Sequence, residues 1–146
     1  ILFLFSYKLI KTGVLMLKLT KKVEYALISL THMSNQEKNH LSSAANIAET
    51  YLIPSEVLAK LLQQLVLCDI IESVKGPLGG YKLKNDISSI NIFDLIEKIE
   101  GPIGIMDCAI DMGCDQIDCC TIKKPLTKIN EKIINTLKQI TLDQIR

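Results

Sequence analysis

Hydrophobic residues recur at intervals of three and four in three early segments of the chain, which is the spacing of one buried face of an α-helix. The first helix is capped by Thr20 and is expected to run to about Asn35. Ser42 or Ser43 caps a short second helix, and Pro54 begins a third, because a first helical turn tolerates a missing amide. The inward-facing residues are expected to be Val23, Ala26, Leu27, Leu30, Met33, Ala45, Ile47, Ala48, Val57, Leu58, Leu61, Leu62, Leu65 and Val66.

Two short strand-like runs follow the third helix and predict a β-hairpin. The strands are expected at residues 70–74 and 81–83, and the glycines between them allow the positive backbone dihedrals that a hairpin tip needs. Two further helices are expected, at residues 92–99 and at about 126–140. The last helix carries one apolar stripe, formed by Leu126, Ile129, Ile133, Ile134, Leu137 and Ile140. The pattern therefore predicts a mainly α protein with one two-stranded hairpin and a long C-terminal helix.

Residues 1–15 form an apolar leading segment. It is too short for a membrane span, Lys8 and Lys11 interrupt it, and no small-residue cleavage site follows, so a membrane anchor or signal peptide is disfavoured. Because Met16 opens a clean helix-entry sequence, we expect translation to start there and residues 1–15 to be a non-native or disordered extension. The remaining length, with 48% hydrophobic and 23% charged residues in the whole chain, fits one compact domain.

The net charge of +1 gives no support to nucleic-acid binding. The charges are unevenly spread, since residues 91–120 carry seven acids against one lysine and residues 121–146 carry six bases against two acids. A DNA-binding hypothesis must therefore rest on the arrangement of particular residues.

The second and third predicted helices have the pattern of a helix-turn-helix, although an ordinary helical hairpin fits that pattern equally well. The hairpin that follows favours a winged helix-turn-helix, because a glycine-rich tip bearing Lys75 suits contact with phosphate or a minor groove. The third helix would then present polar side chains to base edges in the major groove. For each of them taken singly a solvated surface position is the favoured interpretation, and DNA contact is favoured for the helix as a whole. These residues are Ser55, Glu56, Lys60, Gln63 and Gln64.

Three cysteines, Cys108, Cys114 and Cys120, are separated by five residues each, and Cys119 adjoins the last. The stretch 101–120 contains glycines, a proline and four aspartates without a sustained apolar period, so it is predicted to be an irregular loop. Cysteines buried as small hydrophobic residues would follow a periodic face, and these do not. The pattern therefore indicates thiols that together bind a metal or another group.

The total of five cysteines is odd, which disfavours a disulfide framework and favours a reducing cytoplasm. Structural zinc sites favour cysteine pairs separated by two to four residues, whereas iron-sulfur clusters accept longer gaps because several irons spread the ligand positions. The acidic neighbours of the cysteines disfavour the thiolate that a nucleophile needs. An iron-sulfur cluster is thus the preferred interpretation, with zinc and redox-active thiols as alternatives.

Three cysteines leave one ligand position to assign. Cys119 is nearest in sequence, but adjacent residues cannot easily both point at one cluster, so a carboxylate or an imidazole from elsewhere competes with it. The two histidines, His32 and His40, are more typical of exposed or capping residues. Glu24, early in the first helix, is a further candidate whose alternative is an ordinary solvent-facing glutamate.

Several short motifs occur in one order along nearly everything after Met16. They are Leu19-Thr20-Lys21, Glu24-Tyr25-Ala26-Leu27, Ile47-Ala48-Glu49, Lys75-Gly76-Pro77-Leu78-Gly79-Gly80-Tyr81, Gly101-Pro102-Ile103 and the array of Cys108, Cys114 and Cys120. In this order they resemble the IscR/NsrR-type winged-helix transcriptional regulators, and within them the regulators of SUF-type iron-sulfur cluster assembly. A set of motifs in order is much more specific than any one of them.

The resemblance implies a homodimer joined through the long last helix, a cluster held in the loop before that helix, and DNA affinity or sequence choice that changes with cluster occupancy. It also marks Lys75, Gly76, Gly79 and Tyr81 of the hairpin as DNA-binding positions. Lys75 occupies a place where relatives usually have arginine, so the charge is kept and the planar guanidinium fork is lost.

The resemblance also bears on the fourth ligand. Some relatives use a histidine three residues after the last cysteine, where this chain has Lys123, which cannot serve in its charged form. Others use an acidic residue near the start of the first helix, often from the partner subunit, and Glu24 occupies the matching place. Glu24 therefore ranks above Cys119. The residues do not decide the cluster type, and 2Fe-2S is favoured over 4Fe-4S.

The sequence thus predicts a cytoplasmic, dimeric transcriptional regulator, a repressor or activator, that senses iron-sulfur status through its cluster and controls cluster-assembly genes. A winged helix-turn-helix is expected over residues 16–90, and a cluster-binding loop with a dimerisation helix over residues 91–146. The expected partners are double-stranded DNA and a second copy of the chain, with no membrane, no small-molecule substrate and no enzymatic activity. The alternatives are a redox or iron-sulfur carrier or scaffold without DNA binding, and a structural zinc interaction module.

Overall fold

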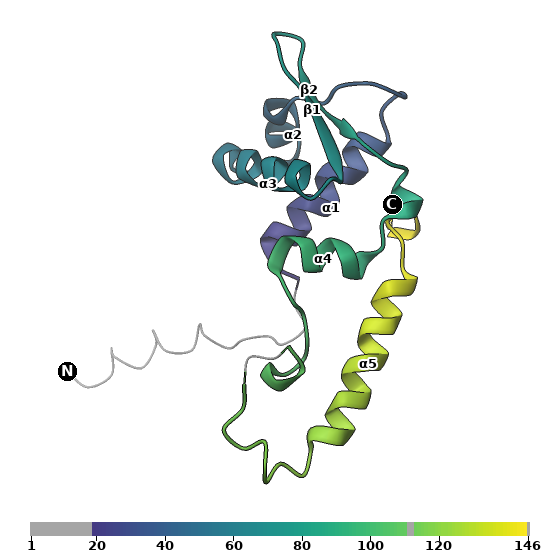
Figure 1. Cartoon of the computed structure of the whole chain (residues 1–146). Coiled ribbons are helices and arrows are strands. Elements are labelled where there is room, and N and C mark those ends of the chain that lie inside the picture. Colours follow the sequence, from purple (N-terminus) through teal and green to yellow (C-terminus); the bar gives the residue numbers. More distant parts are fainter. Residues whose placement is uncertain (1–18, 111–112, 146) are drawn as a thin grey trace, which may run out of the picture.

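The protein is seen in a computed structural model that describes residues 19–110 and 113–145. The expected extension at residues 1–15 lies outside the described residues. The described helices are α1 (Lys21–Ser34), α2 (Ala44–Tyr51), α3 (Ser55–Leu67), α4 (Ile92–Glu100) and α5 (Lys123–Gln139), and the strands are β1 (Ile71–Val74) and β2 (Gly80–Leu83). The predicted mainly α fold is confirmed, with its helix-turn-helix, its two-stranded wing and its long last helix (Figure 1).

The helix starts follow the predicted caps. The Thr20 side chain accepts a hydrogen bond from the Val23 amide at the start of α1, and the Ser43 side chain does the same for the Asn46 amide at the start of α2. Pro54 precedes α3 as its N-cap residue, without a side-chain hydrogen bond to the helix. The first three helices therefore begin within a residue of where the sequence predicts them.

The last helix begins three residues earlier than its apolar stripe predicts, at Lys123 rather than Leu126. Pro125 lies in the first turn, where its missing amide would have no intrahelical partner, so it does not interrupt the helix. The Leu126 amide donates to the Ile122 carbonyl at 3.0 Å, which continues the helix through the proline.

One hydrophobic core joins α1, α2, α3, α4 and the base of the wing. Leu58, Leu61, Leu62 and Leu65 of α3 are fully buried at its centre. Two residues expected in the core are exposed instead, Ala45 and Val57. The eight residues of α2 bury the adjacent pair Ile47 and Ala48, which turns Ala45 outward, and Val57 lies in the first turn of α3, to the side of the leucine stripe, where 44% of it stays exposed.

The wing is an antiparallel pair in which Ile71 faces Leu83 and Val74 faces Gly80. Gly76 has φ +116°, the positive dihedral expected at the tip, and a Cβ at Gly79 would lie 2.1 Å from the Val74 carbonyl oxygen. The backbone of Ser42 pairs with that of Tyr81 through two N–H···O bonds of 2.9 Å. The base of the wing is thereby joined to the segment that leads into α2.

The C-terminal part of the chain is tied to the helix-turn-helix through α4. This helix packs against both α1 and α5, and backbone hydrogen bonds of 2.9 Å join the Ile92 amide to the Ile140 carbonyl and the Leu142 amide to the Ile90 carbonyl. The loop between α4 and α5 lies at the opposite end of the molecule from the wing (Figure 1). The two ends of the molecule are therefore connected mainly through α4 and α1.

The fold makes a prediction about stability. Leu61 is 1% exposed on α3, and truncation in Leu61→Ala is expected to lower the free energy of unfolding by about 2–5 kcal/mol because a buried cavity is left. Leu67 on the same helix is 87% exposed, so Leu67→Ala is expected to change it by no more than about 0.5 kcal/mol. Urea denaturation followed by circular dichroism measures both, and equal losses in the two variants would contradict the assigned core.

Candidate DNA-binding face and cysteine loop

The outer face of α3 carries four exposed polar residues, Ser55, Glu56, Lys60 and Gln63. The leucine stripe on the opposite side fixes this helix against the core, so these side chains point away from it. Within the described part of the chain they form no side-chain hydrogen bond or ion pair with other residues. Their hydroxyl, carboxylate, ammonium and amide groups are therefore available to base edges and phosphates.

Gln64 was predicted to share this face, and the structure places its amide elsewhere. The side chain is half-buried, and its Nε2 donates to the carbonyl oxygens of Lys98 at 3.1 Å and Ile99 at 3.0 Å. Both acceptors belong to the last turn of α4. The physical reason is tertiary: the last turn of α4 lies within hydrogen-bond distance of this side chain, which helical periodicity alone cannot show.

The predicted wing residues differ in their surroundings. Lys75 and Gly76 are exposed near the tip, whereas Tyr81 is half-buried against the core and its backbone pairs with Ser42. Sequence reasoning missed Leu78, which is 91% exposed between the two strands. The available signal was an apolar residue in a Gly-Pro turn that is too short to fold back on the core.

The three evenly spaced cysteines line one hollow. Its volume is about 860 Å³, and it lies between the loop and the start of α5. It is lined by Gly104, Ile105, Met106, Asp107, Cys108, Gly113, Cys114, Asp115, Gln116, Cys120, Ile122, Lys123 and Leu126. The three thiols are free and half-buried. In the described ranges, no three His, Cys, Asp or Glu side chains stand close enough together to hold a single metal ion, so the thiols surround a space without converging on a point.

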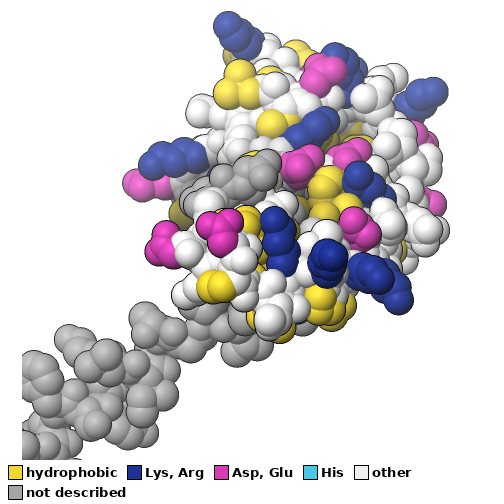
Figure 2. All heavy atoms as spheres, turned by 60° about the horizontal axis from the view of Figure 1, so that its bottom comes forward, with side chains coloured by type: hydrophobic (Ala, Val, Ile, Leu, Met, Phe, Trp, Pro, Cys, Tyr) yellow, Lys and Arg dark blue, Asp and Glu magenta, His cyan; other side chains and the backbone are white. Residues whose placement is uncertain are grey.

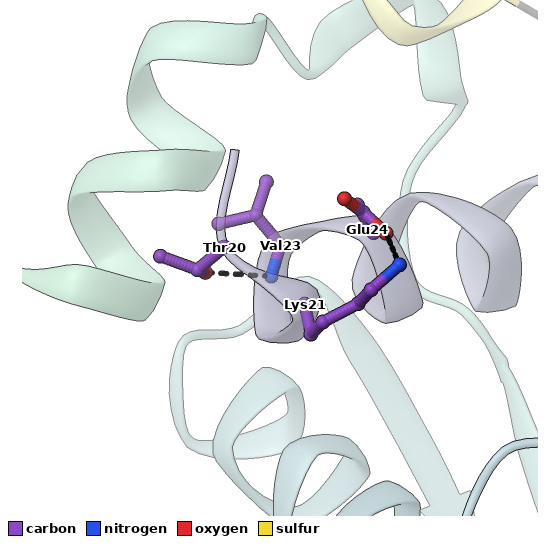
Figure 3. A network of polar contacts seen from close by, with 4 residues as sticks. All are labelled: Thr20, Lys21, Val23 and Glu24. Carbon is purple, nitrogen blue, oxygen red and sulfur yellow. Dashed lines mark hydrogen bonds and ion pairs between the residues drawn. The ribbon is translucent and has the colours of Figure 1, made fainter. Parts of the chain in front are cut away.

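The two candidate fourth ligands lie outside the lining of this hollow. Cys119 is exposed, and its Sγ lies 3.5 Å from the Gln116 carbonyl oxygen. Glu24 forms an ion pair of 2.5 Å with Lys21 in the first turn of α1, and this hydrogen bond raises the pKa of Lys21 (Figure 3). Within one subunit, Glu24 therefore has a lysine as its partner.

The two histidines lie away from the cysteines. His32 is in the last turn of α1, its Nδ1 is 3.2 Å from the Tyr51 hydroxyl, and the two rings meet edge to face. Burial lowers the pKa of His32, and the positive charge of His40 lowers it further. These contacts give His32 a place in the packing of α1 against α2.

The cysteine loop is anchored to α5 by Asn130, another residue that sequence reasoning missed. Its Oδ1 accepts a hydrogen bond of 3.0 Å from the Ile105 amide, and it is the one buried residue among those described in α5. A Cβ at Gly104 would lie 2.9 Å from Cγ2 of Ile110 and 3.3 Å from this Oδ1, so the loop passes close to the helix. The available signal was a polar residue in register with the apolar stripe, three and four positions before Ile133 and Ile134.

The face that contains the loop is chemically mixed. Viewed from that end of the molecule, acidic and basic side chains are interspersed with hydrophobic ones (Figure 2). In the part of the chain that the structure describes, no helix is both long enough and apolar enough to cross a membrane.

Comparison with known proteins identifies the family. The family described as "Rrf2: Iron-dependent Transcriptional regulator" matches residues 19–146. The HTH-type transcriptional regulator NsrR of Oceanobacillus iheyensis is 30% identical over 132 residues, which are 88% of this chain and 89% of the relative. The chain belongs to the Rrf2 family. This Rrf2 protein is therefore a DNA-binding transcriptional regulator.

Solved structures agree on the fold of this Rrf2 chain. CymR, described as the global cysteine regulator of B. subtilis, superimposes with a TM-score of 0.71 at 23% identity and covers 88% of this chain and 95% of its own. The IscR structure from T. potens gives a TM-score of 0.68 at 24% identity and covers 88% and 85%. At these identities the likeness shows the fold alone.

The role of Asn130 can be tested by truncation. Asn130→Ala leaves the Ile105 amide without its acceptor, so we expect a loss of about 1–3 kcal/mol in the free energy of unfolding and faster hydrogen exchange at that amide. Asn135→Ala removes the same group from an exposed position of α5 and should change neither quantity. Unchanged exchange at Ile105 in Asn130→Ala would show that the loop is held by other contacts.

Proposed function

We propose that this Rrf2 regulator senses iron-sulfur cluster status through Cys108, Cys114 and Cys120. The observation that carries the proposal is that all three thiols line one open hollow in the loop between α4 and α5. Thiolates are soft donors that suit iron-sulfur clusters, and a cluster with several irons needs ligands spread around a body rather than focused on a point. The donor set and the open hollow fit such a group.

When bound, the cluster would supply sensitivity to iron supply or to an oxidant. The contribution of the chain is to hold the loop around it: Cys108 and Cys114 come from the loop itself, and Cys120 comes three residues before α5 begins. Ligation by the three thiolates therefore fixes the loop between the end of α4 and the start of α5. Loss of ligation frees that connection, which gives two states with different DNA affinity.

The proposal includes a homodimer joined through α5. This helix packs against α4 on one side, yet only one of its described residues is buried. Ile122, directly before the helix, and Ile129 within it remain 58% and 47% exposed. An apolar helix surface next to a symmetry axis would bury these side chains against the same surface of a second copy and would pair two recognition helices. In such a dimer, Glu24 of one subunit can serve the loop of its partner as the fourth ligand.

The proposed targets are cluster-assembly genes of the SUF type, which the order of motifs in the sequence suggests, and the proposed location is the cytoplasm. Ser55, Glu56, Lys60 and Gln63 would meet the major groove. The wing would contact the backbone or the minor groove through residues 75–79. Tyr81 would hold the wing base in place.

Anaerobic purification with iron and sulfide analysis tests the cluster directly. We expect a coloured protein, and we expect Cys108→Ala, Cys114→Ala and Cys120→Ala each to lose the visible absorption because each removes one of the thiols that line the hollow. Cys119→Ala, the matched control from outside the lining, should retain it. Absorption that is lost in Glu24→Ala would support the carboxylate as the fourth ligand. A colourless protein that contains zinc and no acid-labile sulfide would exclude the cluster.

The salt dependence of promoter binding tests the wing. Because each neutralised phosphate releases counterions, Lys75→Ala should reduce the slope of log K against log salt concentration by about one. Lys128→Ala removes an exposed lysine from α5, away from the wing, and should leave the slope unchanged. Fluorescence anisotropy with a labelled promoter duplex gives both slopes. An unchanged slope in Lys75→Ala would place the wing away from the DNA backbone, and a carrier or scaffold protein would show no specific complex at all.

A further inference from the structure

The last turn of α4 is held by side chains from two other helices. Gln64 of α3 donates to the Lys98 and Ile99 carbonyls, and Lys22 of α1 donates to the Ile99 carbonyl at 3.1 Å. The hydroxyl of Thr20 donates to Glu100 Oε1 at 2.6 Å. The last turn of α4 therefore contacts both α1 and the recognition helix α3, and this set of contacts is called the joint.

The physical basis of this joint is the set of carbonyl groups that every helix leaves without an intrahelical partner in its last turn. In α4, two of these carbonyls accept from the one amide nitrogen of Gln64. A second pair of contacts lies beside it, because Lys98 Nζ donates to the Cys68 carbonyl at 3.3 Å while the Cys68 thiol lies 3.6 Å from the Lys98 carbonyl. The C-terminal end of α3 is thus linked to the backbone of residues 98 and 99 in α4.

This joint also lies directly before the cysteine loop. Gly101 ends α4 with φ +88°, and its amide still donates to the Glu97 carbonyl at 2.9 Å. Pro102 follows, and Cys108 comes six residues later. Only a few residues therefore separate the cysteines from the backbone that Gln64 contacts, and one of them, Ile105, is held to α5 by Asn130.

We propose that Gln64 is a positioning residue that carries the state of the cysteine loop to the recognition helix, rather than a residue that reads bases. The inference rests on the proposed function, because it needs two states of the loop. Its amide fixes α3 to the last turn of α4, so a shift of that turn changes the angle at which Ser55, Glu56, Lys60 and Gln63 meet DNA. Gln63, the exposed neighbour of Gln64, lacks this link.

The two roles predict different measurements. Allosteric coupling is the ratio of DNA affinities in the two states, so a residue that transmits the state changes this ratio. A residue that reads bases changes both affinities by a similar factor and leaves the ratio unaltered. A residue that only stabilises the fold lowers the midpoint of thermal unfolding and leaves the ratio unaltered as well.

The experiment uses the full chain, purified anaerobically, in its cluster-loaded form and after removal of the cluster by a chelator. A labelled duplex, selected by the wild-type protein from random-sequence DNA, is the probe, and anisotropy gives its dissociation constant in both forms. The variants are Gln64→Leu, which removes the donor at similar size, and Gln64→Arg, which restores donors. Gln63→Leu is the matched control.

We expect Gln64→Leu to keep the visible spectrum of the cluster and to move the affinity ratio toward one by about fivefold or more, the lower end of the range typical of allosteric coupling. Gln64→Arg should regain most of the ratio, and Gln63→Leu should weaken both forms by similar factors. If Gln64→Leu does not fold, Gln64→Glu, which has the same size and places acceptors against the two carbonyls, is expected to give the same loss of the ratio.

If Gln64→Leu lowers the DNA affinity of both forms equally and keeps the wild-type ratio between them, the inference is overturned. Gln64 is then a residue that contacts bases. A wild-type protein without a cluster, or one whose affinity does not depend on it, would overturn the proposed function, and the inference would fall with it. The wild-type measurements therefore separate the two failures.

Discussion

The structure depends on one constraint, the need of the α4 carbonyl groups for partners. The last turn of a helix has no backbone donors of its own to offer them, and burial of unpaired carbonyls costs free energy. In this protein the donors come from Lys22 of α1 and Gln64 of α3. The same contacts that satisfy the helix end therefore fix α1 and α3 to the segment that enters the cysteine loop.

The loop is held close to where it leaves α4 by hydrogen bonds from two of its backbone amides. Gly101 closes α4 at one end, and near it Ile105 donates its amide to the buried side chain of Asn130 on α5. Between these points and the start of α5, three free thiols surround an open space. This arrangement fixes the first residues of the loop against α4 and α5 and leaves the three thiols around the open space. In the proposed function, this space is where a bound group would sit.

Much of the fold follows from local patterns, and the differences have physical reasons. The leucine stripe of α3, the Thr20 and Ser43 caps and the positive φ at Gly76 were all predictable from residue type and spacing. The cysteine loop has no period, so only its residue types could suggest a common site, and its shared hollow emerges from the structure. Gln64 and Asn130 show the limit most clearly. Each is a polar residue whose role depends on a segment far away in sequence, the last turn of α4 for Gln64 and the loop residue Ile105 for Asn130, and periodicity carries no information about that neighbour.

Amide hydrogen exchange of the cluster-loaded and cluster-free protein, in the absence of DNA, tests the central claim most directly. Two amides report on the joint, Cys68 N, which donates to the Gln64 carbonyl, and Gly101 N, which donates to the Glu97 carbonyl. The amide of Ile53, which donates to the Ala48 carbonyl at the end of α2, is the internal control. We predict that cluster removal accelerates exchange at Cys68 and Gly101 together and leaves Ile53 unchanged. Acceleration confined to the residues after Gly101 would contradict the account.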